Sequence, residues 1–305
     1  MVRAAGVRIG WQNLPAEVRA GVEQIIGGRV VEALSQEGGF SPGTADRVRT
    51  ETGRRAFVKA VSPAINTHSA ELLRQELRVT AALPADAPVP SLLGGFDTGD
   101  WVVLVLADIE GVEPRTPWVE SEIDAAVTTL RELAAALTPA PDIGLPRAAD
   151  RLRADLTAWE QLAADPPADL DPWTREHLPD LCAAGARGLA AVATGDTVVH
   201  CDIRADNILV RPDGRMVIVD WPWACVGPAW LDTTLLALNV AVHGGDTDRV
   251  VAGLDPGVVT DVIAGVTGML RHYSRLPPPP GLPTVRAFQR WQADELLPWL
   301  RSRLP

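Results

Sequence analysis

The stretch HCDIRADNILV, residues 200–210, decides the fold. It holds Asp202 and Asn207, five positions apart, directly before the apolar run ILV, which predicts a strand. The turn signal RPDG at 211–214 and the run RMVIVD at 215–220 follow it. Strand, turn and strand together predict a β-hairpin with oxygen-bearing side chains at both of its ends.

The expected register of this hairpin brings two of these side chains together. With 211–214 as the turn, Asn207 faces Ile218, and Asp220 becomes the diagonal neighbour of Asn207 on the same face. Diagonal neighbours lie roughly 7 Å apart. Two oxygen ligands at that span can share Mg²⁺, which takes a few protein oxygens together with phosphate and water. A solvated polar turn is the alternative that the hairpin alone leaves open.

A second signal is the only lysine of the chain, Lys59, in AFVKAV at 56–61; the other 27 of the 28 basic residues are arginine. Lysine is a compact point charge and arginine a wide planar fork, so a lone lysine indicates a tight site for a small cation. Glu76 falls near the middle of the apolar face of a helix expected over 67–83. A buried carboxylate needs a cationic partner, and Lys59 is a better candidate than a nearby arginine.

Composition excludes several classes of protein. The chain has 305 residues, 47% of them hydrophobic, which is enough for two lobes with a large core. A net charge of −11 disfavours nucleic-acid binding, and no apolar run approaches the length of a membrane span. Cys182, Cys201 and Cys225 have no close spacing, so we expect neither a disulfide framework nor a zinc site, and a cytoplasmic location.

Periodicity divides the chain into a strand-rich first third and a helical remainder. The first third predicts helices at 15–26 and 67–83 and strands at 30–36, 44–50, 54–61, 91–96 and 101–108. The glycine-rich EGGFSPG connects the first two strands. The remainder predicts helices at 121–137, 148–163, 175–193, 233–242, 257–273 and 285–297, interrupted by a strand-rich island at 197–220.

The glycine-rich loop, Lys59, Glu76, Asp202, Asn207 and Asp220 follow the order of the protein-kinase-like phosphotransfer machinery. HCDIRADNIL, then IVDW and GPAWLD, resembles the aminoglycoside phosphotransferase and choline-kinase-like family, as do GGFSPGTADRV and AFVKA. The resemblance covers most of residues 30–240. It implies an α+β, protein-kinase-like fold with a small β-rich nucleotide-binding lobe at 1–107 and a larger helical lobe at 108–305 for catalysis and acceptor binding.

The resemblance also implies catalytic roles for matching residues. Lys59 would hold the α- and β-phosphates of ATP, and Glu76 would orient Lys59. Asp202 would accept or orient the proton of the acceptor hydroxyl. Arg204 would touch the transferred phosphate, and an ion pair with Asp206 is the alternative that stays open for it.

The remaining roles concern the metal, the base and the support of the loop. Asn207 and Asp220 would ligate Mg²⁺. Gly39 and Ser41 lie in the loop that would cover the phosphates, and the connector near Leu106 and Asp108 would offer backbone groups to adenine. His200 and Asp232 are expected to be structural, with Asp232 bracing the catalytic loop.

The expected function is therefore ATP-dependent transfer of the γ-phosphate to a hydroxyl of a small, cationic, aminoglycoside-like molecule, with antibiotic resistance as one role that this implies. Kinases of choline, an amino sugar or another alcohol remain alternatives, as does a pseudokinase scaffold. A protein kinase is disfavoured, because WPWACVGPAWLD after Asp220 leaves no room for an activation loop. The acidic residues that could bind a cationic acceptor are scattered: Asp232, Asp246, Asp248, Asp261, Asp294 and Glu295.

Overall fold

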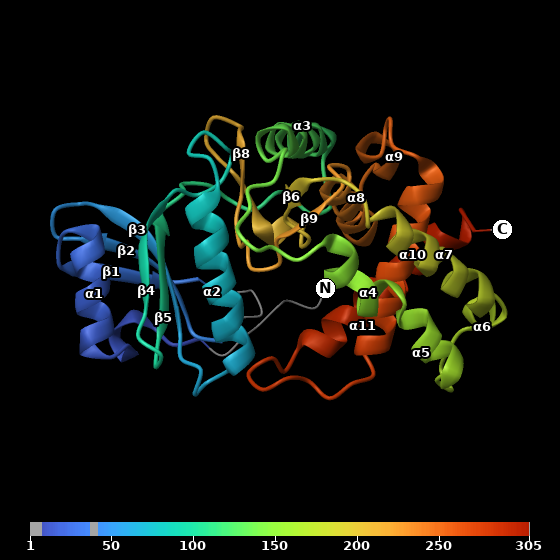
Figure 1. Ribbon diagram of the computed structural model, residues 1–305, viewed down its shortest axis with the longest axis horizontal. Coiled ribbons are helices and arrows are strands. Elements are labelled where there is room, and N and C mark those ends of the chain that lie inside the picture. Colours follow the sequence, from blue (N-terminus) through green and yellow to red (C-terminus); the bar gives the residue numbers. More distant parts are fainter. Residues whose placement is uncertain (1–7, 37–41, 305) are drawn as a thin grey trace.

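The computed structural model describes residues 8–36 and 42–304, which form two lobes (Figure 1). The first lobe contains a five-stranded antiparallel sheet in the order β1-β2-β3-β5-β4. Its strands are β1 (Val30–Ser35), β2 (Thr44–Thr50), β3 (Arg55–Val61), β4 (Leu92–Asp97) and β5 (Val102–Ala107). All five were predicted from the sequence to within two residues at either end.

Helices cover both faces of this sheet. α1 (Ala16–Ile26) packs on the face that carries Val103 and Val105 of β5, and α2 (Thr67–Ala82) packs on the face that carries Leu104. Because both faces are buried, β5, which lies between β3 and β4, consists entirely of apolar residues. Figure 1 shows that α2 lies on the side of the sheet that faces the second lobe, so a side chain on α2 can reach both.

The second lobe is mainly helical around one hydrophobic core. Helix α10 lies at its centre and contacts α4, α5, α7, α8 and α11. Its helices are α3 (Glu120–Ala136), α4 (Ala148–Leu156), α5 (Ala158–Ala164), α6 (Pro172–Glu176), α7 (Leu178–Ala191), α8 (Leu231–His243), α9 (Thr247–Val250), α10 (Pro256–Tyr273) and α11 (Val285–Arg301). No helix in the described part of the chain is long and apolar enough to cross a membrane.

Two of the expected long helices are broken in the structure. The helix predicted over 148–163 ends at Leu156 and restarts at Ala158. The hydroxyl of Thr157 donates to the carbonyl of Arg153 at 2.9 Å, a bond that bends helices. The helix predicted over 175–193 is broken one residue before Leu178, because Pro179 in the first turn of α7 fits only at a helix start.

A β-hairpin and a two-stranded ribbon carry the central motif. The hairpin pairs β7 (Ile208–Val210) with β8 (Met216–Ile218), and the ribbon pairs β6 (Thr197–Val199) with β9 (Cys225–Gly227). The strand β9 was not predicted, because it has only three residues between tryptophans and a proline. A 3-10 turn, η2 (Ala205–Asn207), leads into the hairpin.

The predicted register of the hairpin is wrong by one residue. Val210 pairs with Met216, so the loop has five residues, not four, and Asn207 lies opposite Val219, whose N–H donates to the Asn207 carbonyl at 2.9 Å. The five-residue loop is favoured by Gly214, which takes a left-handed φ of 80°. The alternation of the strand therefore does not place Asp220. A φ of 70° at Asp220 itself turns its side chain instead.

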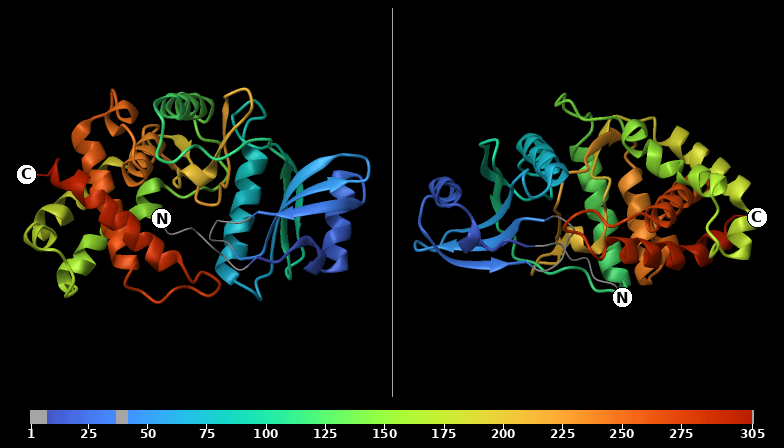
Figure 2. Two further views of the ribbon diagram at one scale, coloured as in Figure 1. Left: turned by 180° about the vertical axis from the view of Figure 1, so that it is seen from behind. Right: turned by 90° about the horizontal axis from the view of Figure 1, so that it is seen from below.

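Backbone hydrogen bonds join this hairpin to the connector after β5 and to a loop of the first lobe. Val112, in the connector after β5, exchanges two hydrogen bonds with Val210 at 3.0 and 2.7 Å. On the other strand, the Ile218 N–H donates to the carbonyl of Pro88, in the loop between α2 and β4, at 2.9 Å. At the opposite side of the molecule, the loop before α11 runs below α2 (Figures 1 and 2), and the Asn66 amide donates to the carbonyl of Pro280 at 3.4 Å.

Candidate active site

Lys59 lies between two carboxylates that come from distant parts of the chain. Its Nζ donates to both oxygens of Glu76, at 2.7 and 2.9 Å, and to Oδ1 of Asp220 at 2.5 Å. Lys59 is on β3, Glu76 on the sheet-facing side of α2, and Asp220 directly follows the β7–β8 hairpin. The side chain of Glu76 is 3% exposed and that of Asp220 is 36% exposed, so Asp220 is the carboxylate that faces the open side.

The charges of this cluster follow from its geometry. Burial opposes a charge on Lys59, but the carboxylates of Asp220 and Glu76 outweigh it and raise the pKa of Lys59 above its ordinary value. Burial also acts to raise the pKa of Asp220, and the ammonium of Lys59 outweighs it, leaving that pKa below its ordinary value. Burial dominates at Glu76 and raises its pKa. At neutral pH Lys59 is therefore a cation beside an ionised Asp220.

The loop between β6 and β7 is held from behind by Asp232, in the first turn of α8. The carboxylate of Asp232 accepts from the N–H of His200 at 2.7 Å and from that of Cys201 at 3.0 Å. The N–H of Asp202 donates to Nδ1 of His200 at 3.2 Å, so the other ring nitrogen carries the hydrogen and donates to the Val219 carbonyl at 2.9 Å. His200 thus joins the loop to the segment before Asp220. Asp232 and His200 thus contact the backbone of the loop and of the segment after it, which is the supporting position expected of them.

We expect Asp232→Ala to destabilise the fold by about 3 kcal/mol, because it leaves two buried N–H groups without an acceptor. Asp232→Asn keeps one acceptor oxygen and should fall between this variant and the wild type. The measurement is chemical denaturation followed by tryptophan fluorescence. The control is Asp294→Asn, which weakens only an exposed ion pair with Arg290 and should leave stability nearly unchanged. Equal losses of stability in Asp232→Ala and Asp294→Asn would contradict the role of Asp232 in bracing the loop.

Asp202 and Asn207 lie together on this loop. The Asn207 amide donates to the backbone carbonyl of Asp202 at 2.8 Å and to its Oδ2 at 3.1 Å. Burial raises the pKa of Asp202, against the attraction of Arg204 and His200. The side chain is 25% exposed. An oriented, partly exposed carboxylate with a raised pKa is suited to take or align a proton.

Arg204 makes the ion pair that the sequence left open. Its Nε and Nη2 donate to the two oxygens of Asp206, at 2.9 and 2.6 Å. Its Nη1 also lies 3.5 Å from Oδ1 of Asp202, and its guanidinium lies 5.8 Å from the ring centre of Phe288 on α11. Arg204 therefore lies on the same loop as Asp202, and in the observed arrangement its charge is shared between two carboxylates.

Asn207 and Asp220 are linked through the backbone, since the N–H of Val219, next to Asp220, donates to the Asn207 carbonyl, and both carry oxygen atoms of the kind that Mg²⁺ prefers. The amide nitrogen of Asn207 is used by Asp202, which directs the amide oxygen away from that residue. One carboxylate oxygen of Asp220 contacts Lys59. Across residues 8–36 and 42–304, no three His, Cys, Asp or Glu side chains gather as a metal site. Two protein oxygens without a third ligand match an ion that takes the rest of its ligands from phosphates and water.

The residues expected around the nucleotide are only partly brought together. Gly39 and Ser41 lie outside the described residues. Leu106 is buried near the end of β5. The carboxylate of Asp108 accepts from Arg47 at 2.7 and 3.0 Å and from Arg55 at 2.7 Å. The side chain of Asp108 is therefore engaged by two arginines, and a contact between its backbone and a base stays a prediction.

The scattered carboxylates do not converge beside Asp202. Asp232 binds the loop backbone, and Asp246 caps α9 by accepting from the N–H of Arg249. Three others form ion pairs: Asp248 with Arg303, Asp261 with Arg187 and Asp294 with Arg290. Glu295 is exposed on α11. The described residues thus show no cluster of these carboxylates that could concentrate a cationic acceptor.

The neighbourhood of Arg204 is aromatic, which was not predicted. The ring centres of Phe288 and Trp291 on α11 lie 5.7 Å apart, and His243 at the end of α8 lies 5.2 Å from Trp291. Burial lowers the pKa of His243. The only signal in the sequence is the spacing of Phe288 and Trp291, three residues apart on one helix, which does not distinguish a binding surface from a core.

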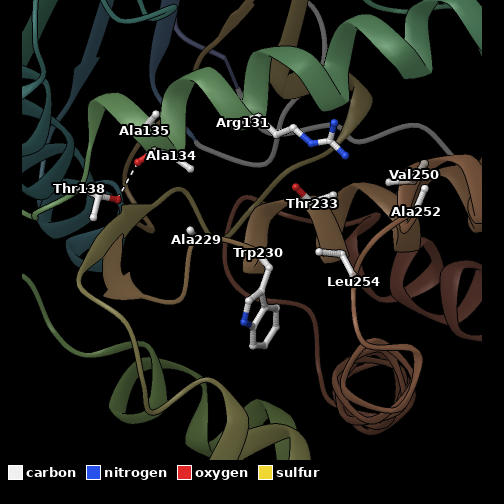
Figure 3. Close-up of a pocket in the computed structure, with 10 residues that line it drawn as sticks. All are labelled: Arg131, Ala134, Ala135, Thr138, Ala229, Trp230, Thr233, Val250, Ala252 and Leu254. Atoms are coloured by element: carbon white, nitrogen blue, oxygen red, sulfur yellow. Dashed lines mark hydrogen bonds between the residues drawn. The ribbon is translucent and has the colours of Figure 1, made fainter.

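A cavity of about 360 Å³ lies apart from these residues (Figure 3). Arg131 of α3, Trp230 before α8 and Leu254 after α9 are among the residues that line it. None of the expected site residues lines it, and its walls are mostly apolar. The cavity is therefore separate from the residues expected to form the site.

Comparison with protein families gives a match over most of the chain. A family model described as the phosphotransferase enzyme family matches residues 38–255, a range that includes Lys59, Glu76, Asp202, Asn207 and Asp220. No curated protein matches the chain.

Solved structures of low sequence identity share the fold. An aminoglycoside phosphotransferase from Alicyclobacillus acidocaldarius is 15% identical, with a TM-score of 0.54 over 95% of this chain and 96% of that one. A thermostable mutant of aminoglycoside phosphotransferase APH(4)-Ia, in a ternary complex with ADP and hygromycin B, is 14% identical, with a TM-score of 0.63 over 94% and 99%. Macrolide 2′-phosphotransferase MphH from Brachybacterium faecium is 15% identical, with a TM-score of 0.61 over 93% and 99%.

Proposed function

The chain belongs to the phosphotransferase enzyme family, and from this premise we propose that it transfers the γ-phosphate of ATP to a hydroxyl group of a small molecule. One observation supports the proposal above all. Lys59 contacts Glu76 and Asp220, and Asp220 is linked through Val219 and His200 to the loop that carries Asp202. The residues proposed as the phosphate-binding cation, a metal ligand and the proton acceptor are thus connected to one another.

On the nucleotide side, residues 1–107 would bind ATP. Lys59 would contact the α- and β-phosphates, with Glu76 fixing its position, and the glycine-rich loop with Gly39 and Ser41 would cover the phosphates. Backbone groups near Leu106 and Asp108 would contact the base. Asn207 and Asp220 would hold Mg²⁺, which, when bound, neutralises charge on the phosphate oxygens.

On the acceptor side, residues 108–305 would supply the catalytic loop. Asp202 would orient the acceptor hydroxyl and take its proton as the oxygen forms a bond to the γ-phosphorus and the bond to the β-phosphate oxygen breaks. Arg204 would approach the transferred phosphate after exchanging part of its contact with Asp206. We place the reaction in the cytoplasm, where ATP is available, and phosphorylation of an antibiotic hydroxyl there would confer resistance.

We further propose that the acceptor is hydroxylated and cationic, resembling an aminoglycoside. A net charge of −11 and the fold shared with a phosphotransferase bound to hygromycin B support this. Because the nearby carboxylates are engaged, attraction would come from the field of the whole acidic surface and not from one focused cluster.

If the acidic surface attracts the acceptor, the KM for the acceptor should depend on the salt concentration. Raising the ionic strength should raise KM for the acceptor with little change in kcat, since charges on an exposed surface are screened beyond about 10 Å at 0.1 M salt. Steady-state kinetics at several salt concentrations measures this, with a neutral alcohol of similar shape as the control. A neutral acceptor that works best, with a KM independent of salt, contradicts the cationic assignment and leaves phosphoryl transfer itself intact.

The experiment that tests the function is a coupled assay of ADP release across aminoglycosides, macrolides and other hydroxylated antibiotics, choline and sugar amines. The Asp202→Ala variant serves as the blank for each compound. Turnover that depends on both the acceptor and Asp202 supports an enzyme. ATP binding without turnover of any acceptor would instead favour a nucleotide-binding scaffold.

A further inference from the structure

Two cysteines that are far apart in sequence have their sulfurs in contact. Sγ of Cys201 and Sγ of Cys225 lie 2.8 Å apart, although their spacing in the chain predicted no disulfide. The β6–β9 ribbon explains the contact. Val199 of β6 pairs with Cys225 of β9, and Cys201 follows Val199 by two residues. The third cysteine, Cys182, is partly buried on α7.

The two cysteines differ in accessibility. Cys225 is fully buried, whereas part of the surface of Cys201 is exposed, so Cys201 is the residue nearer to solvent. The contact with Cys225, burial and the nearby carboxylate of Asp232 hold the pKa of the Cys201 thiol well above its ordinary value, against the attraction of Arg151. The thiolate is therefore scarce at neutral pH, and reaction with an oxidant is slow.

We propose that Cys201 and Cys225 form a site of covalent oxidation, at which a hydroperoxide converts the two thiols into a reversible disulfide that disables the catalytic loop. The peroxide is the oxidant and the two cysteines are the reductant. The thiol of Cys201, the residue nearer to solvent, receives the first oxygen, and the thiol of Cys225 completes the bond.

The reaction balances in two steps. The sulfur of Cys201 attacks one oxygen of hydrogen peroxide, the O–O bond breaks, and a sulfenic acid and one water form. The sulfur of Cys225 then attacks Sγ of Cys201 and displaces the hydroxyl as a second water, which carries the thiol proton. Two thiols and one peroxide thus give one disulfide and two waters.

The disulfide would act on the catalytic loop because of where Cys201 stands. It precedes Asp202, its N–H is held by Asp232, and its φ of 64° is already in the left-handed region that disfavours non-glycine residues. An S–S bond is about 2.0 Å long, so the two sulfurs must approach by roughly 0.8 Å. Misplacing catalytic groups by about 1 Å can cost about 10²-fold in rate, so turnover should fall at least tenfold.

Peptide mapping tests the bond itself and does not depend on the proposed function. Trypsin places the cysteines in three separate peptides: 176–187 with Cys182, 188–204 with Cys201 and 216–249 with Cys225. The folded protein is treated with hydrogen peroxide, alkylated, digested and analysed by mass spectrometry. We expect 188–204 linked to 216–249, with 176–187 unlinked. Free Cys201, or oxidation confined to Cys182, overturns the proposal.

A variant tests the role of Cys225 as the second thiol. In Cys225→Ala no thiol can displace the hydroxyl, so dimedone should label Cys201 after peroxide treatment, whereas the wild type should show the disulfide and little label. Cys182→Ser is the matched control and should behave as the wild type. Equal labelling of Cys201 in the wild type and Cys225→Ala overturns the assignment of Cys225.

The loss of turnover rests on the proposed function and is measured separately. Wild-type protein and Cys182→Ser are assayed for acceptor-dependent ADP release before oxidation, after oxidation and after dithiothreitol. We expect at least a tenfold fall in kcat that dithiothreitol reverses. A mapped disulfide with unchanged kcat overturns the effect on the loop, while absence of turnover before oxidation counts against the proposed function and not against the bond.

Discussion

Replacing Asp202 with alanine is expected to lower phosphoryl transfer by about 10³-fold while Mg·ATP binding stays nearly intact, as for the loss of a positioned general base. Asp202 contacts Asn207, a proposed ligand of Mg²⁺, but it is not one of the carboxylates that hold Lys59, the residue proposed to bind the phosphates. Its polar contacts are Asn207, Arg204 and the ring of His200, whereas Lys59 contacts Glu76 and Asp220. The proposed partner of Asp202 is the acceptor hydroxyl. Turnover is measured by ADP release and nucleotide binding by calorimetry.

Asp220→Ala is the matched comparison, since it also removes one carboxylate from the same site. It should abolish the metal-dependent part of nucleotide binding, because Asp220 is a proposed ligand of Mg²⁺ and a contact of Lys59. Calorimetry with and without magnesium distinguishes the two variants. If Asp202→Ala weakens Mg·ATP binding as much as Asp220→Ala does, the roles given to the two residues are wrong.

Lys59→Arg is expected to lower turnover by about 10²-fold although the charge is kept. One oriented contact with developing phosphate charge is worth roughly 3 kcal/mol, or about two decades in rate. The ammonium has three hydrogen-bonded carboxylate oxygens within 2.9 Å, and its side chain is 18% exposed. A wider guanidinium must displace α2 or the segment at Asp220 to fit.

The readout for Lys59→Arg is kcat at saturating ATP, with thermal unfolding to show that the variant is folded. Arg215→Lys is the control, because it exchanges the same two residue types in an ion pair on the exposed hairpin turn. It should keep near-native turnover. Near-native turnover in Lys59→Arg as well would show that a compact cation is not required.

Much of the fold could be predicted because its patterns are local. The strands around Lys59 alternate or are continuously apolar, and each ends at a turn signal, so their bounds were predictable. The pairing of Lys59 with Glu76 followed from one argument, that a carboxylate on the apolar face of a helix needs a cation. Hydrogen bonds of 2.7 and 2.9 Å confirm that pairing. The expected phosphotransferase family is confirmed by the match over residues 38–255.

The errors arose where local pattern does not decide the structure. The register of the β7–β8 hairpin depends on whether the turn contains four or five residues, and RPDGR fits either. The breaks at Thr157 and before Leu178 come from a side-chain hydrogen bond and one proline in otherwise helical patterns. Each of these errors concerns a shift or a break of a single residue, and the periodicity of apolar residues does not resolve a difference of that size.

Contacts between distant segments were beyond prediction from spacing. Cys201 and Cys225 meet only because β9 pairs with β6, and β9 is three residues long. The acidic candidates could not be ranked for the same reason. Whether a carboxylate is available to a ligand depends on which arginine lies beside it, and Asp248 pairs with Arg303, 55 positions away. The positions of Gly39 and Ser41 stay predictions.

The hydrogen bonds between the β7–β8 hairpin and segments of the first lobe limit how the two lobes can move relative to each other. Three backbone hydrogen bonds of 2.7 to 3.0 Å join Val112, Val210, Ile218 and Pro88 along one side, whereas the bond from Asn66 to Pro280 on the opposite side is 3.4 Å long and uses a rotatable amide. A rigid rotation of the sheet would therefore pivot about the hairpin. Atoms near a pivot move least, so Asn207 and Asp220, the proposed ligands of Mg²⁺, would move little relative to each other. The contact between Asn66 and the loop before α11 would be lost first.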